Sequence, residues 1–108
     1  MIFLTLKFLA EYDYMEVVDN TEMRHFEARE EDQLAIIEYQ IQEKKIFLTR
    51  VDFPSGFEEN GKAEAMIERT LDIIEESGMR VVPMKRVLKQ HFKSHPDRRK
   101  MLPVGIHL

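Results

Sequence analysis

The stretch from Leu48 to Ala63, LTRVDFPSGFEENGKA, combines residue types that could bind a phosphate-bearing ligand. Gly61 and Ala63 are small, so an extended phosphate ligand could approach the backbone at the start of a helix. The first turn of a helix also offers N–H donors without intrahelical partners and about half a unit of positive charge. Ordinary helix starts share this Gly-x-Ala pattern, so the pattern alone leaves both interpretations open.

A second group of candidates is a row of cations near the C-terminus: Lys85, Arg86, Lys89 and Lys93. A basic helical face of this kind either contacts phosphate or is simply solvated. His91 and His95 belong to the same segment. We expect His91 to pack against the core rather than to act in catalysis. We expect no metal site, because no third ligand stands at a suitable spacing from the two histidines.

Alternating hydrophobicity predicts that strands carry the first group of candidates. Leu34 to Ile41 and Lys45 to Phe53 each alternate with a period of two, and the polar pair Glu43-Lys44 between them favours a tight antiparallel hairpin. Pro54 lacks a backbone N–H and therefore ends the pairing. Two shorter strands are expected upstream, at Val17-Val18 and Arg24 to Ala28, separated by the turn-prone Asp19-Asn20.

The period changes to that of a helix after Pro54. The pattern predicts a helix from Asn60 to Ser77, with Asn60 as its N-cap and Gly78 directly after its end. The rest of the pattern predicts a short buried strand at Met79 to Val82 and a helix at Met84 to Ser94 that His95-Pro96 stops. This order indicates an α+β fold, a mostly antiparallel sheet with two main helices packed on it.

Composition narrows the function classes. The 108 residues are 44% hydrophobic and 33% charged, which fits one domain, expected at residues 15–108, preceded by an N-terminal extension or extra element at residues 1–14. A net charge of −4 argues against nucleic acid as the main partner, although any polyanion would meet residues 80–108, where Asp97 is the one acid. The absence of cysteine excludes disulfides and thiolate sites. The apolar first ten residues have no basic start and are too short to span a membrane, so a cytoplasmic location is expected.

The joint spacing of several short motifs resembles the GNAT superfamily of acetyltransferases, and more narrowly its small single-domain subfamily. The resemblance extends from Val17 to about Leu102. Its carriers are Val18-Asp19-Asn20, Phe26-Glu27, Glu38-Tyr39, the strand end from Leu48-Thr49 to Asp52-Phe53-Pro54, Gly61-Lys62-Ala63, Gly78, Val81-Val82-Pro83 and His95-Pro96.

The resemblance implies that acetyl-CoA binds with its pantetheine arm beside Asp52 and Phe53. It places the pyrophosphate against the backbone amides of Glu59, Asn60, Gly61, Lys62 and Ala63. Lys85 stands where the subfamily commonly has a cysteine, and with Arg86 it is expected to contact phosphate rather than to carry an acyl group. Other departures are Glu58 in place of Arg or Gln, and Arg50 and Val51 in place of His and Thr.

Two functions follow from the resemblance. The first is an N-acetyltransferase that moves an acetyl group to an unidentified small or protein amine, with Asp52 as the catalytic candidate that steers or deprotonates the amine. The second is an inactive domain of the same fold that binds CoA or another protein. The departures at Arg50 and Lys85 and the two carboxylates of Glu58 and Glu59 favour it. A nucleic-acid module fits least, because the C-terminal cations are not interleaved with aromatic residues.

Overall fold

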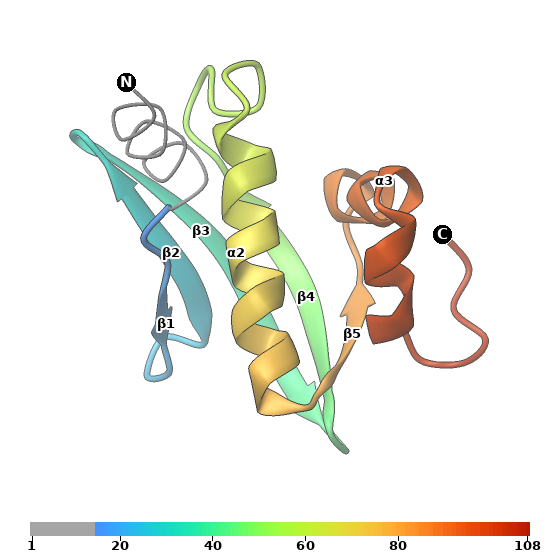
Figure 1. Ribbon diagram of the computed structural model, residues 1–108. Coiled ribbons are helices and arrows are strands. Elements are labelled where there is room, and N and C mark those ends of the chain that lie inside the picture. Colours follow the sequence, from blue (N-terminus) through green and yellow to red (C-terminus); the bar gives the residue numbers. More distant parts are fainter. Residues whose placement is uncertain (1–14) are drawn as a thin grey trace, which may run out of the picture.

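A five-stranded sheet with strand order β1-β2-β3-β4-β5 forms the centre of the structure (Figure 1). The computed structural model describes residues 15–108, so the expected N-terminal extension at residues 1–14 lies outside the described part. The strands are β1 (Val18–Asn20), β2 (His25–Glu30), β3 (Gln33–Gln42), β4 (Lys45–Asp52) and β5 (Arg80–Pro83). Neighbouring strands pair antiparallel except β4 and β5, which are parallel. The expected α+β class with a mostly antiparallel sheet is confirmed.

Helix α2 (Lys62–Ser77) connects the two parallel strands and crosses one face of the sheet (Figure 1). Its apolar stripe, which includes Met66, Leu71 and Ile74, is buried. It packs in one core with Ile37 of β3 and Leu48 of β4. Helix α3 (Arg86–Ser94) and the 3₁₀ helix η1 (Pro96–Met101) follow β5. Within residues 15–108, no helix is both long and apolar enough to cross a membrane.

Two local predictions about turns and caps are wrong. Asp19-Asn20 does not separate the first two strands but belongs to β1, where Asp19 pairs with Phe26 of β2. The turn follows Asn20, whose side-chain oxygen accepts a hydrogen bond from the Met23 amide at 3.1 Å. At the start of α2 the N-cap is Gly61 rather than Asn60, because the chain enters the helix through a left-handed conformation with φ 75° that glycine adopts without strain.

The hairpin of β3 and β4 is confirmed, but its alternation is interrupted by a β-bulge. Glu38 pairs with Arg50 and Tyr39 pairs with Leu48, so Thr49 is the extra residue on β4. Before the bulge Leu48 is buried against α2, and after it Val51 packs against the same core. The expected unbroken alternation of β4 is therefore wrong beyond Leu48, since one extra residue moves every following side chain to the other face.

Candidate functional site

Strand β4 continues beyond the point where β5 leaves it. The parallel pairing ends with Leu48 opposite Pro83, and the Met84 amide then donates to the Leu48 carbonyl at 3.1 Å. On its other side β4 stays paired with β3 as far as Asp52, which lies opposite Ile36. The segment from Thr49 to Asp52 therefore has one paired edge and one edge from which β5 has departed. Such an edge can pair with an extended ligand that carries amide groups of its own.

The loop between β4 and α2 is held by hydrogen bonds among its own backbone groups. The Phe57 carbonyl accepts from the amides of Lys62 and Ala63, both at 3.1 Å. The Asn60 amide donates to the Gly56 carbonyl at 3.1 Å, and the Gly61 amide donates to the backbone carbonyl of Glu58 at 3.2 Å. Four of the five amides expected to bind pyrophosphate are thus engaged within the loop. A phosphate group at this helix start would have to share or displace these bonds.

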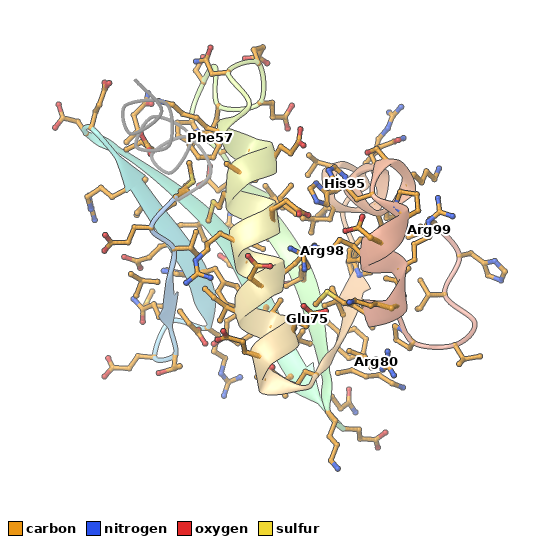
Figure 2. The ribbon with its side chains drawn as sticks, in the orientation of Figure 1. Phe57, Glu75, Arg80, His95, Arg98 and Arg99 are labelled. Atoms are coloured by element: carbon orange, nitrogen blue, oxygen red, sulfur yellow. The ribbon has the colours of Figure 1, made fainter. Side chains whose placement is uncertain are left out.

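Phe57 anchors this loop, although it is not among the site residues that the sequence predicts. Its side chain is buried, and its ring centroid lies 5.2 Å from that of Phe53, the residue that follows β4. The available signal was a single large apolar residue among the polar and small residues of the loop. Figure 2 shows Phe57 beside the first turn of α2. The contact fixes the loop against the end of the strand that leads into it.

Asp52 presents an exposed carboxylate at the end of β4. Its Oδ2 atom lies 4.0 Å from Nη1 of Arg50, and its side chain is 61% exposed. Arg50 also donates two hydrogen bonds to Oε2 of Glu38, at 2.5 and 2.9 Å. These bonds hold the pKa of Glu38 below its ordinary value. Asp52 therefore belongs to a small charged group on the sheet and is accessible from solvent.

A family model described as GCN5-related N-acetyl-transferase matches residues 25–101, which are 77 of the 108 residues. This chain belongs to the GCN5-related N-acetyltransferase family. The matched part begins with β2 and ends with η1, so it contains the open edge of β4, the loop and the start of α2. Comparison with curated proteins gave no match. Family membership implies the use of acetyl-CoA.

The remaining site candidates of this acetyltransferase domain lie just after β5. Lys85 is the N-cap residue of α3 and has an extended backbone conformation. Its carbonyl accepts hydrogen bonds from the amides of Leu88 and Lys89, both at 3.0 Å. Lys85 and Arg86 are both exposed. Because β4 and β5 are parallel, the segments that follow them leave the sheet at the same end. The two cations and the loop after β4 therefore share one end of the sheet.

The backbone groups and charges around the end of β4 suit the pantetheine arm of acetyl-CoA better than its pyrophosphate. The open edge of β4 offers backbone groups that suit the two amides of a pantetheine arm. The loop suits a pyrophosphate less well, because its amides are engaged and the exposed Glu58 and Glu59 repel anions. Lys62, in the first turn of α2, already forms an ion pair, because its Nζ atom lies 3.5 Å from Oε2 of Glu30 on β2. Lys62 could neutralise the phosphates only after it released Glu30.

Proposed function

We propose that this acetyltransferase domain transfers the acetyl group of acetyl-CoA to an amine, with the pantetheine arm paired to the open edge of β4. The observation that carries the proposal is the departure of β5 at Leu48 while β4 continues to Asp52 on β3. A strand edge of this length can hold an extended ligand in one register, and register determines where the reacting carbonyl lies. The family match supplies the chemical class of the reaction.

The chain's own residues have three roles in this proposal. Asp52 attracts a cationic amine and accepts its proton, since its carboxylate is exposed at the end of the edge. A backbone N–H near Phe53 donates to the carbonyl oxygen as negative charge develops on it. The amides from Glu59 to Ala63 bind the phosphates once their hydrogen bonds within the loop are shared or displaced, and Lys85 and Arg86 supply the positive charge. Acetyl-CoA supplies the acetyl group as an activated thioester.

A second candidate function is an inactive domain that binds CoA or a protein partner without turnover. The closed hydrogen bonding of the loop favours it, as do Glu58 and Glu59 beside the proposed phosphate position. If such a domain binds CoA, the edge of β4 would still hold the pantetheine arm, but Asp52 would have no role. The two functions therefore differ in turnover and in the effect of a substitution at Asp52.

A thiol-release assay separates the two functions with little background, because the chain contains no cysteine and the only thiol formed is that of CoA. Acetyl-CoA is incubated with a panel of polyamines and lysine-containing peptides, and the free thiol is followed over time. We expect Asp52→Asn to lower kcat by about 100-fold or more while CoA affinity, measured by calorimetry, stays unchanged. Asp32→Asn, in the turn between β2 and β3, is the matched control and should leave both unchanged. CoA binding without thiol release from any amine would support the inactive domain instead.

A further inference from the structure

Two pairs of side chains of the types that ligate metal ions face each other where α3 packs beside α2. Glu64 and Glu68 are four residues apart on α2, and His91 and His95 are four residues apart on α3 and its C-cap. Ligand atoms of Glu68, His91 and His95 lie within 4.8 Å of one another. Glu64 is the fourth member of the group, because its Oε1 atom lies 3.2 Å from Nε2 of His95. Figure 2 shows His95 at the side of α3 that faces the first half of α2.

The hydrogen bonds of the two histidines direct the same ring nitrogen toward α2. Nδ1 of His95 donates to the His91 carbonyl at 2.8 Å, because a carbonyl can only accept, so Nε2 is the nitrogen left for a ligand. Nε2 of His91 lies 2.6 Å from Oε2 of Glu68. The two rings are stacked, with centroids 3.9 Å apart and planes inclined by 8°. Both Nε2 atoms therefore meet carboxylate oxygens on one helix.

Arg98 of η1 holds the Glu68 carboxylate from the other side. Its Nε atom donates to Oε1 and Oε2 of Glu68 at 3.3 and 3.2 Å, and its Nη2 atom donates to Asp72 at 2.6 Å. The Arg98 side chain is 10% exposed. Figure 2 shows Arg98 beside α2. Such outer partners orient the ligands of metal sites in proteins.

Burial decreases across the group from one side to the other. The side chain of His91 is 4% exposed and that of His95 is 24% exposed. On α2, Glu68 is 33% exposed and Glu64 is 65% exposed. The group thus has a buried base and an open side, from which an ion and a water ligand can enter. Tetrahedral zinc sites place ligand atoms roughly 3.4 Å apart. The ligand atoms of Glu68, His91 and His95 already lie within 4.8 Å of one another, and the His91–Glu68 pair, at 2.6 Å, would separate to admit the ion.

We propose that Glu68, His91 and His95, with Glu64 or water as the fourth ligand, bind a divalent transition-metal ion of the zinc class and tie α3 to α2. Two imidazoles and one or two carboxylates form a donor set that suits zinc and cobalt(II). Spacing along the sequence offers no third ligand beside the two histidines and therefore predicts no metal site. Glu68 is that third ligand, and it is separated from His91 by 23 residues.

The test uses the untagged full chain, treated with a chelator and then titrated with zinc chloride. Calorimetry should show one zinc ion per chain, and the midpoint of thermal unfolding should rise with zinc. Cobalt(II) should give the intense visible absorption of a tetrahedral site. His95→Ala and Glu64→Gln are the informative variants, because both side chains are partly exposed and neither belongs to the core. His107→Ala, near the C-terminus and exposed, is the matched histidine control.

We expect His95→Ala to lower zinc affinity about tenfold or more and His107→Ala to leave it unchanged. Weaker zinc binding by Glu64→Gln as well would identify Glu64 as the fourth ligand, whereas unchanged zinc affinity in that variant would identify water as the fourth ligand. Far-ultraviolet circular dichroism of each variant without metal checks that it is folded. Zinc binding weaker than about 1 mM would overturn the proposal, and so would equal affinity of the unmodified chain and folded His95→Ala.

Discussion

The Met84 amide donates a 3.1 Å hydrogen bond to the Leu48 carbonyl, and beyond this bond β4 and β5 separate. The β-bulge at Thr49 begins at the next residue of β4. Bulges increase local twist and bend the strand that contains them. We infer that the bulge and the departure of β5 together create the open strand edge on which the proposed acetyl-CoA site depends.

The first prediction concerns the negative charge beside the proposed phosphate position. Glu58→Gln should tighten CoA binding by roughly two- to fivefold, because it removes one exposed charge that repels the phosphates. The gain should shrink as salt concentration rises. Glu22→Gln, an exposed residue in the turn between β1 and β2, is the matched control and should not change the affinity. Calorimetry with CoA and with phosphate-free pantetheine checks the result, since pantetheine affinity should be equal in all three proteins.

The second prediction concerns the left-handed conformation at the start of α2. Gly61→Ala should lower the free energy of unfolding by about 1 kcal/mol or more, because φ is 75° at this position and a Cβ atom is strained there. Gly61→Asn should cost less, since asparagine tolerates this conformation better. Urea denaturation of the three proteins measures the difference. Equal losses in both variants would show that backbone strain is not the cause.

The sequence predicted regular elements better than it predicted the contacts between them. Local periodicity predicts the β3–β4 hairpin and α2. The polar pair Glu43-Lys44 predicts the turn of the hairpin, and the structure has the turn there, with φ of 51° and 65° at these two non-glycine residues. The bulge at Thr49 has no sequence signal of its own, because a single extra residue looks like continued alternation. The site residues proposed from the family pattern remain predictions.

The group around His91 shows the limit of spacing arguments. His91 is buried, as expected from its place on the helix. Its partner Glu68 lies on α2, and nothing in the local sequence of either residue marks the pairing. On sequence evidence Glu68 belongs to the polar side of its helix, which is solvated unless another element covers it. Only the packing of α3 and η1 on α2 brings these charges together.

The third prediction concerns Arg98, a buried cation that holds η1 to α2. Arg98→Met should lower the free energy of unfolding by about 2–3 kcal/mol, because it removes the guanidinium that donates to Glu68 and Asp72, although Glu68 keeps its contact with His91. Lys100→Met is the matched control: Lys100 pairs with Glu75 at 3.3 Å, but its side chain is 71% exposed. That substitution should cost less than about 1 kcal/mol. Urea denaturation with zinc absent compares the two variants, and equal losses would contradict the prediction.

The fourth prediction concerns the alkaline side of the stability profile. Burial, together with a 2.6 Å hydrogen bond donated to Asp19, raises the pKa of Tyr39 to about 12. An unfolded tyrosine has a pKa of about 10, so the unfolded chain loses this proton first as pH rises. The stabilisation is fully present below about pH 10 and is lost progressively as pH rises toward 12.

Tyrosinate absorbance tests this prediction when the titration of Tyr39→Phe is subtracted from that of the unmodified chain. The difference should appear near pH 12, or at the pH of alkaline unfolding if that comes first. A difference centred near pH 10 would contradict it, because it would show a hydroxyl that ionises as it does in water.

The most direct measurement is an amide-resolved NMR titration of the full chain with acetyl-CoA. We predict that the largest amide shifts occur at Thr49 to Phe53, along the edge that β5 leaves, and at the loop from Phe57 to Ala63. The turn between β1 and β2, around Glu22, should show no change. Saturable shifts confined to other elements, or no saturable shifts at all, would contradict the proposal that this strand edge binds the acetyl donor.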